Sequence, residues 1–438
     1  MPPAGGMLDL ELRPFDDDSE KFHKATSSVP ANVVDTRWED LAPMENLSQY
    51  ASHWQRPTAD MAADMAKSLI PPKQPPPKPR LVLDLDHTLL CASTAADIVK
   101  HMKSPAQPNE DTMARAVRAL KAFKMVTTVP ELGIIIKLRP GLQSFLAACS
   151  EHYELCVYTH APDERYVKAA IKAIDPNGTY IGDRVAHGAS AAEKTVKTLT
   201  DIFPLFWGKK KSDDVNSDGA GASEGAGGGG GSDEVVDISR ILVVDDSVSV
   251  WPRHARNLVK CERYLFFPES ARNFGHDPRR ALFLHARDEV SDRGLLTALG
   301  KVMAEVAGRF REMWREAQAP GSGAGSSMVA KPDIRDAVEH VRKQVLRGCV
   351  LLFSAMLSRQ QIQTKTFLKN RHYALAIALG AQVVFEKSNL VTHVVSANPG
   401  TDKCVWGRST HLHVVKPEWL DATGALWKRA DESSFALS

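Results

Sequence analysis

Two pairs of aspartates follow apolar runs that have the length and composition of buried strands. Asp84 and Asp86 interrupt the run LVLDLDHTLL, and Asp245 and Asp246 end the run RILVVDD. Carboxylates this close repel one another and lose hydration when buried, so a proton, a basic group or a cation must compensate them. Because open parallel sheets bind ligands beyond the carboxyl ends of their strands, we expect both pairs at one edge of a sheet.

An oxygen-rich pocket of this kind suits a hard cation such as Mg²⁺, with Asp84, Asp86 and Asp246 as candidate ligands. With the charge neutralised, an ionised Asp84 could attack a phosphorus atom. Asp86 could protonate the leaving oxygen and later take a proton from water. A DxD pair alone is more often a strand end that caps a turn than a catalytic pair. The string DLDHTL after an apolar strand is more specific, and it favours phosphoryl transfer.

The composition indicates a chain with more than one hydrophobic core. It has 438 residues, of which 43% are hydrophobic, and this length favours two or three domains. The formal net charge of +2 gives no reason to expect nucleic acid or an anionic membrane as partner. The six cysteines are scattered without a CxxC pair, which favours a reducing intracellular compartment over a zinc or dithiol site. The sequence has no apolar run that could span a bilayer and no signal-peptide pattern at its N-terminus.

Changes of composition divide the chain into four parts. Residues 1–79 are predicted to be a mostly disordered leader that ends in the proline-rich linker IPPKQPPPKPR. Residues 80–318 alternate short apolar strands with helices, which predicts an α/β fold with a parallel sheet. Residues 319–332 are predicted to be a linker, and residues 333–438 a small α/β module.

Within the second part, the apolar string IIIKL at 134–138 is predicted to be a strand of these βαβ units, and an Ala-rich helix is expected at 112–124. The Gly- and Ser-rich stretch 208–234 cannot bury enough apolar surface to order itself and is predicted to be disordered. Residues from about 268 to 314 are expected to form a helical block.

Several separate stretches resemble one phosphatase family. DLDHTLL resembles the DxDxT signature of the haloacid-dehalogenase superfamily. The stretches KLRPGLQSFLAACSEHYELCVYTH, IDPNGTYIGDRV and VVDDSVSVWPRHARNLVKCERYLFFPESARNFG resemble, in order, the RNA polymerase II C-terminal-domain phosphatases that interact with transcription factor IIF. HTLL is similar to plant members. The resemblance covers about Leu81 to Arg311, and it implies a haloacid-dehalogenase-like parallel sheet with helices on both faces, followed by a helical insertion.

The resemblance implies distinct roles for the acidic residues. Asp84 would be the nucleophile that forms an aspartyl-phosphate, and Asp86 would be the general acid and base. Mg²⁺ would be held by Asp84, by the backbone carbonyl of Asp86 and by Asp246. Asp245 would complete the fourth motif by orienting a lysine.

Three further residues are implied to bind phosphate. Thr159, at the end of ELCVYT, matches the hydroxyl of the second motif, although an isolated threonine there would only form a turn. The segment VKTL points to Lys197 as the phosphate-binding lysine, with Lys194 as its competitor. Arg184 is the third candidate, in the segment GDRV.

The chain departs from the family at two places near this site. His187 stands where a second arginine is expected, which puts substrate phosphate recognition there in doubt. His160 and Ala161 replace the usual Met-Gly after the second-motif threonine, a change that could alter peptide docking without touching the catalytic acids.

The last part of the chain resembles a BRCT domain, with which these phosphatases typically end. The resemblance rests on Gly380 after a helix, on the strand THVVS and on Trp419, which is predicted to be a core residue. In BRCT domains that read phosphopeptides, a Ser or Thr after the first strand and a Lys hold the phosphate. Ser354 and Lys403 are the candidates. A partner site that does not read phosphate, and a helix-cap role for Ser354, are the alternatives.

The resemblance implies a nuclear, magnesium-dependent protein serine/threonine phosphatase. Its substrate would be the phosphorylated heptad-repeat tail of RNA polymerase II, with the BRCT module as the targeting part and general transcription factors as further partners. No nucleic acid or membrane is expected as a direct partner. Two rivals stay open: a phosphatase of another phosphoprotein or small phosphate ester, and a BRCT-based scaffold with weak catalysis. A response-regulator receiver also begins with a strand that ends in paired acids, but it would leave DLDHTL unexplained.

Overall fold

The computed structural model describes residues 75–102, 106–188, 196–202, 237–319 and 331–438. The Gly-rich stretch and most of the predicted leader and linker lie outside these residues. In the part described, no helix combines the length and the apolar character that crossing a membrane requires. Pro76–Ala317 and Met328–Ser438 belong to one compact unit, so the predicted domain boundary between them stays a prediction.

A five-stranded parallel sheet carries the paired aspartates. Its strand order is β6-β5-β1-β7-β8, and every neighbouring pair is parallel. The strands are β1 (Arg80–Leu83), β5 (Glu154–Thr159), β6 (Val185–His187), β7 (Ile241–Asp245) and β8 (Leu258–Lys260). Both faces are buried, because Leu81 and Leu83 enter one hydrophobic cluster and Val82 enters another. Since β1 lies between β5 and β7, the carboxyl ends of these three strands meet at the same edge.

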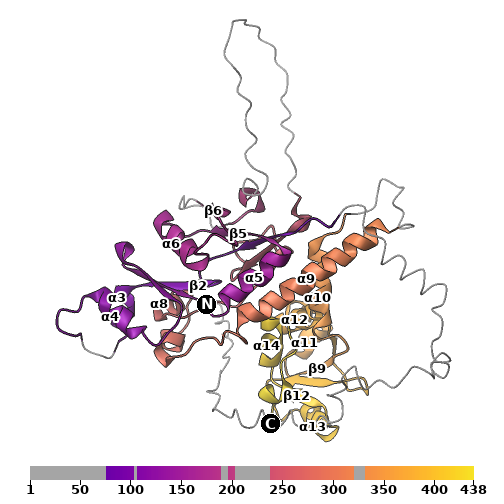
Figure 1. Ribbon diagram of the computed structural model, residues 1–438. Coiled ribbons are helices and arrows are strands. Elements are labelled where there is room, and N and C mark those ends of the chain that lie inside the picture. Colours follow the sequence, from indigo (N-terminus) through magenta and orange to yellow (C-terminus); the bar gives the residue numbers. More distant parts are fainter. Residues whose placement is uncertain (1–74, 103–105, 189–195, 203–236, 320–330) are drawn as a thin grey trace, which may run out of the picture. The chain divides into compact units, whose positions relative to one another are not determined.

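Helices cover both faces of this sheet. On the side of Leu81 lie α5 (Leu142–His152), α6 (Glu164–Ile174) and the long α9 (Leu295–Gln318). Helix α9 runs alongside α5 (Figure 1), and the hydroxyl of Tyr153 donates to the carbonyl of Met303 at 2.8 Å. The side of Val82 is covered by Trp251 and two 3₁₀ helices, η4 (Leu199–Ile202) and η5 (Ile238–Arg240).

The prediction that residues 134–138 belong to the parallel sheet is wrong. They form β4 (Ile134–Leu138), the middle strand of a separate antiparallel sheet with β2 (Leu90–Thr94) and β3 (Val126–Val129). Only residues 130–133 connect β3 to β4, whereas a parallel crossover needs about a dozen residues or more. Helices α3 (Ala95–Lys100) and α4 (Thr112–Ala119) pack on this sheet, and α4 confirms the helix expected there, in a shorter form.

The helical block expected at about 268–314 includes most of the long α9, but its first part is only partly helical. It contains α8 (Pro268–Asn273) and two 3₁₀ helices, η6 (Pro278–Arg280) and η7 (Leu282–His285). Two ion pairs with buried cations and half-buried carboxylates connect the stretch that follows to the end of β4: Lys137 with Asp288 at 2.6 Å and Arg139 with Glu289 at 2.7 Å.

The C-terminal residues form the expected small α/β module. Its four strands are parallel in the order β10-β9-β11-β12. They are β9 (Val350–Ser354), β10 (Gln382–Val384), β11 (His393–Ser396) and β12 (His413–Val415). The helices are α10 (Ile334–Gln344), α11 (Arg359–Gln363), α12 (Arg371–Ala378), α13 (Asp402–Ser409) and α14 (Glu418–Leu426). The 3₁₀ helix η8 (Thr366–Lys369) lies between α11 and α12, and η9 (Glu432–Phe435) follows α14. Trp419 is fully buried in the cluster that contains Phe353, which confirms its predicted core position.

Candidate active site

The paired aspartates meet at the carboxyl edge of the parallel sheet. Strand β1 ends at Leu83, and the next amide, that of Asp84, still donates to Val244 of β7 at 3.0 Å. This bond brings the ends of the two strands together. The carboxylates of Asp84, Asp245 and Asp246 are buried, and each offers an oxygen within 4.8 Å of the others.

Asp86 lies in the tight loop that follows β1. The amide of Leu89 donates to the carbonyl of Leu85 at 2.9 Å, and His87 has a left-handed φ of 64°. The hydroxyl of Tyr166, from α6, donates to the Asp86 carboxylate. Sequence reasoning missed Tyr166, whose only signal is its place on the apolar face of a predicted helix.

Lys197 binds one aspartate from each of the two pairs. Its ammonium group donates to Asp84 Oδ1 at 2.6 Å and to Asp245 Oδ2 at 2.8 Å. Its amide donates to Val250 at 2.7 Å, which fixes the backbone, and the indole of Trp251 also donates to Asp245 Oδ2, at 2.9 Å. The structure therefore brings Lys197 to the predicted nucleophile, while its competitor Lys194 lies outside the described residues.

Burial and charge shift the pKa values in this cluster in opposite directions. Burial raises the pKa of Asp84 to about 7, although Lys197 opposes the shift; the neighbouring Asp245 adds to it. Burial also raises the pKa of Asp86, against the hydrogen bond from Tyr166. For Lys197 burial alone would lower the pKa, but the two carboxylates outweigh it and the pKa is raised. Lys197 is therefore a permanent cation that stabilises ionised Asp84.

Thr159 lies at the same edge, on the other side of β1. Because Leu83 is in register with Val157, Thr159 ends β5 just beyond the level of Asp84. Its hydroxyl is buried and accepts a hydrogen bond from the amide of Ala161 at 3.0 Å.

Arg184 is not brought to the carboxylates, and its phosphate-binding role stays a prediction. It precedes β6, and its guanidinium donates to the carbonyls of Leu155 and Tyr180, each at 2.7 Å. Leu155 lies near the amino end of β5, four residues before Thr159, so Arg184 sits at the far end of the strands. Arg184 belongs to the GDRV segment, but it precedes β6 and therefore lies at the opposite end of the strands from the site.

The two histidines that depart from the family flank the end of β5. The His187 ring contacts the carbonyl of Ala161, and His160 packs edge-to-face on Tyr158 with ring centroids 5.5 Å apart. Burial lowers the pKa of His160, and the nearby positive charge of Lys197 adds to this shift.

Arg263 is a second residue that sequence reasoning missed. It follows β8, and its Nε donates to Oδ2 of Asp246. Its guanidinium also lies 4.0 Å from the ring centroid of Phe274. No motif marks this position, since the arginine reaches the site only because β8 runs beside β7 in the sheet.

The carboxylate oxygens of this cluster suit a divalent cation. Asp84 Oδ1 is bound by Lys197 and Asp246 Oδ2 by Arg263, but Asp84 Oδ2 accepts no hydrogen bond from any residue that the structure describes. A buried carboxylate oxygen without a donor, beside two further carboxylates, is the environment that hard cations with oxygen ligands occupy. Among the side chains that the structure describes, those of Asp84, Asp245 and Asp246 form a group that could hold such an ion. The Asp86 ligand implied by the resemblance is a backbone carbonyl, and it stays a prediction.

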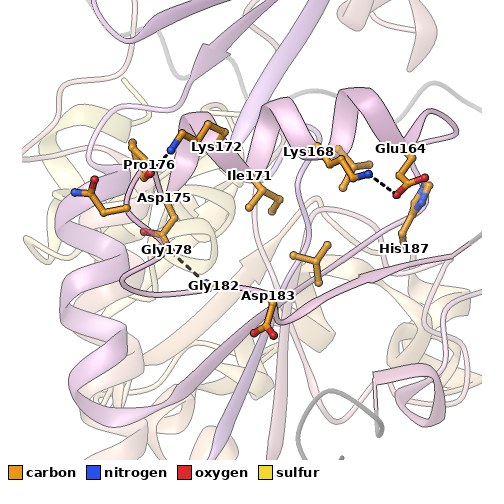
Figure 2. Close-up of a pocket in the computed structure, with 13 residues that line it drawn as sticks. Glu164, Lys168, Ile171, Lys172, Asp175, Pro176, Gly178, Gly182, Asp183 and His187 are labelled. Atoms are coloured by element: carbon orange, nitrogen blue, oxygen red, sulfur yellow. Dashed lines mark hydrogen bonds and ion pairs between the residues drawn. The ribbon is translucent and has the colours of Figure 1, made fainter. Parts of the chain in front are cut away.

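A groove between α6 and β6 is separate from this cluster. It encloses about 610 Å³, and α6 forms one wall while the 175–183 loop and β6 form the other (Figure 2). Its lining includes Lys168, Asp183 and, at one end, His187, but none of the paired aspartates. The reactive groups of the site therefore lie outside this groove.

The predicted phosphate contacts of the C-terminal module are engaged within the module. The Ser354 hydroxyl is buried and donates to Thr401, the N-cap of α13, at 2.8 Å. Lys403, in the first turn of α13, donates to the carbonyl of Phe385. The two residues lie at the same end of the sheet, and their role in phosphopeptide binding stays a prediction.

Comparisons with known proteins give one consistent result. Residues 79–274 match the family described as NLI interacting factor-like phosphatase. RNA polymerase II C-terminal domain phosphatase-like 4 of Arabidopsis thaliana is 30% identical over 363 residues, which are 82% of this chain and 69% of the relative. Phosphatase-like 3 of the same plant is 28% identical over 359 residues, which are 82% of this chain but only 25% of the relative.

Solved structures share the fold. The structure of Fcp1, an essential RNA polymerase II CTD phosphatase, has a TM-score of 0.52 at 24% identity and covers 82% of this chain and 96% of that chain. A fission yeast Fcp1 variant bound to beryllium fluoride has a TM-score of 0.50 at 23% identity, covering 88% and 100%. These likenesses confirm the predicted fold class.

Proposed function

Because this chain belongs to the family of RNA polymerase II C-terminal domain phosphatase-like proteins, we propose that it removes phosphate from serine and threonine residues of the RNA polymerase II heptad-repeat tail. Membership confirms the resemblance inferred from the sequence, including its likeness to plant members, and with it the predicted class of protein phosphatases. The chain spans 69% of one of these relatives and 25% of the other, so its substrate and partners are proposals.

One observation carries the proposed activity: Lys197 binds Asp84 and Asp245 together, beside a carboxylate oxygen of Asp84 that accepts no hydrogen bond from the described residues. A lysine in this position compensates the buried negative charge and also offers N–H donors to a phosphate. Thr159, at the same edge, offers a hydroxyl. An acidic cluster with such donors suits a phosphate ester better than it suits a carboxylate substrate, which carries less charge to bind.

In the proposed reaction the ionised Asp84 attacks the phosphorus atom, and the bond from phosphorus to the serine oxygen breaks. Asp86 gives its proton to that oxygen, and the raised pKa of Asp86 favours the protonated form that this step needs. The ionised Asp86 then takes a proton from a water molecule whose oxygen attacks the phosphorus. The bond to Asp84 breaks, and inorganic phosphate leaves.

Phosphatases of this type generally depend on a metal ion, and we propose Mg²⁺. Asp84, Asp246 and the backbone carbonyl of Asp86 would hold it, with Asp245 close enough to contribute. When bound, such an ion neutralises negative charge on the attacking carboxylate and on the phosphate. We further propose that the protein acts in the nucleus, where its substrate is, and that general transcription factors are among its partners.

The test compares the wild-type chain with Asp84→Asn and Asp86→Asn on serine-phosphorylated heptad peptides, with Mg²⁺ and with a chelator. We expect phosphate release that needs Mg²⁺ and is abolished by Asp84→Asn. An ester with a good leaving group, such as p-nitrophenyl phosphate, needs no proton from Asp86 in the first step, so Asp86→Asn should lose less activity on this ester than on the peptide.

A panel of small phosphate esters is the control for substrate class. Faster turnover of a metabolite than of every phosphopeptide would replace the proposed substrate by a small molecule. If folded wild-type protein releases no phosphate from either panel, while a polymerase-tail peptide still binds, the scaffold interpretation takes its place.

A further inference from the structure

Arg263 is held at the mouth of the acidic cluster by two contacts. Its Nε donates to Oδ2 of Asp246, and its guanidinium plane lies 4.0 Å from the ring centroid of Phe274. Phe274 in turn packs edge-to-face on His87, with ring centroids 4.8 Å apart. An arginine with an ion pair at one nitrogen and an aromatic ring under its face has few rotamers left, so its remaining donors are pre-oriented.

The remaining donors of this arginine have no use inside the described fold. Nη1 and Nη2 of Arg263 donate to no residue that the structure describes. The side chain is 31% exposed, whereas that of Lys197 is 4% exposed. Lys197 therefore serves a phosphate buried at Asp84, and Arg263 faces a group that stays nearer to the surface.

Phe274 supports the same location for a ligand. It is a large hydrophobic residue that is 36% exposed directly beside the catalytic loop, although burying its ring would be favourable. An exposed aromatic ring stacked with arginine is a recurrent element of recognition surfaces, because the pair offers charge and apolar area together.

We propose that Arg263 and Phe274 form an anion subsite that binds a second phosphate or carboxylate on the peptide whose scissile phosphate lies at Asp84. The inference rests on the proposed function. The two parallel N–H donors of the guanidinium fork match the oxygens of such a group, and binding them leaves the Nε bond to Asp246 intact. The chain thereby selects multiply phosphorylated or acidic stretches of its substrate.

The experiment measures binding rather than turnover. The full chain carrying Asp84→Asn, which lacks the proposed nucleophile, is titrated in Mg²⁺ with labelled heptad peptides that carry one or two phosphoserines. Fluorescence anisotropy gives both dissociation constants. We expect the doubly phosphorylated peptide to bind about tenfold more tightly, and we expect Arg263→Gln in the same background to remove this preference. A peptide with glutamate in place of the second phosphoserine distinguishes a carboxylate from a phosphate.

The ratio of the two dissociation constants isolates the subsite. Arg263→Gln could also act through Asp246 on the metal or on the scissile phosphate. Such an effect weakens the binding of both peptides equally and cancels in the ratio of their dissociation constants. Phe274→Leu, which removes the aromatic face but keeps an apolar side chain, should reduce the ratio partly. Arg279→Gln removes the same charge from an exposed loop arginine paired with Asp277, and it should leave the ratio unchanged.

Two results would overturn the subsite: a ratio near one in the Asp84→Asn chain, or a ratio that Arg263→Gln does not change. The proposed function fails separately, if the wild-type chain turns over small esters but no phosphopeptide. The ratio of dissociation constants still tests the role of Arg263 in that case, because it does not depend on phosphate release.

Discussion

The ammonium group of Lys197 lies 2.6 Å from Oδ1 of Asp84, although 113 residues separate them along the chain. The contact is buried on both sides, so the positive charge is desolvated together with the carboxylates that it compensates. Pairs of this kind have little tolerance for the loss of one partner, because the other is left as an uncompensated buried charge. Stability and chemistry at this edge of the sheet therefore depend on the same lysine.

Replacing Lys197 by methionine should reduce phosphatase activity by about 10² to 10³-fold, the usual cost of losing one buried donor to a reacting anion. The variant loses the group that stabilises ionised Asp84, so the nucleophile becomes more basic and is protonated at neutral pH. Steady-state kinetics on a phosphopeptide measures the loss. Lys168→Met, which removes an exposed lysine paired with Glu164, is the control, and equal activity of the two variants would contradict the role of Lys197.

The raised pKa of Asp84 predicts how cation binding depends on pH. Since the metal-free protein holds a proton on Asp84 below about pH 7, proton and cation compete there. The apparent affinity for Mg²⁺ should fall by about tenfold per pH unit below pH 7 and stay constant above it. Isothermal titration from pH 5.5 to 8.5 tests this. Asp84→Asn should bind the ion more weakly with a flatter profile, and a flat profile in the wild-type chain would show that Asp84 is ionised throughout.

The sequence predicts the reactive residues that directly end apolar strands. Asp84 and Asp246 directly follow strands of one parallel sheet and Thr159 is the last residue of another, and the sheet topology alone brings such positions to one edge. Lys197 was found only through the family resemblance, because it lies in an irregular segment without a periodic pattern.

The residues that the sequence did not predict reach the site through tertiary structure. Arg263 arrives because β8 runs beside β7, and Tyr166 arrives through the packing of α6. Arg184 lies away from the carboxylates, because nearness to a motif in sequence does not specify which end of a strand a residue occupies. The antiparallel pairing of β4 depends on a connection of residues 130–133 that an apolar string alone does not reveal.

The bond between Arg139 and Glu289 predicts a large loss of stability on substitution. Arg139 is 1% exposed, pairs with Glu289 at 2.7 Å and donates to the carbonyls of Thr88 and Glu262 at 3.1 and 2.9 Å. Arg139→Met should lower the free energy of unfolding by about 3–5 kcal/mol, because it leaves the half-buried Glu289 carboxylate and two backbone carbonyls without their donor.

Urea denaturation followed by tryptophan fluorescence gives this difference. The matched control is Arg256→Met, which breaks an exposed pair with Asp336 at 2.8 Å and should cost less than about 1 kcal/mol. Similar losses for both variants would mean that the Arg139–Glu289 pair contributes no more to the free energy of unfolding than a surface ion pair does.

Two glycines of the C-terminal module separate backbone strain from steric overlap. Gly348 and Gly380 have φ values of 83° and 92°, but a Cβ at Gly348 would meet no atom within 4 Å, whereas one at Gly380 would lie 1.9 Å from the carbonyl oxygen of Lys343. Gly348→Ala should cost about 1–2 kcal/mol, the strain of the left-handed conformation. Gly380→Ala should cost several kcal/mol more, because α10 must move. Thermal melting of both variants tests the order, and equal melting temperatures would contradict it.

His393 predicts that the C-terminal module loses stability in acid. The side chain is 1% exposed, stacks on Trp419 with ring centroids 4.8 Å apart, and faces Glu432, Arg429 and His413. Burial lowers the pKa of His393 to about 4, the charges of Arg429 and His413 add to the shift, and Glu432 opposes it. The folded module therefore holds the neutral ring where the unfolded chain already binds a proton.

The sign of the effect follows from this difference in proton binding. Above the unfolded pKa of about 6.5 both states are neutral at this residue and its contribution to stability is complete. As the pH falls from about 6.5 to 4, only the unfolded state takes up the proton, so the module should lose up to about 3 kcal/mol. Urea denaturation of the full chain between pH 4 and 8 measures the slope. The His393→Gln side chain cannot titrate, so this variant should show a flatter dependence of stability on pH between about 4 and 6.5, even if it is less stable at pH 8. An unchanged slope would assign the acid sensitivity to other groups.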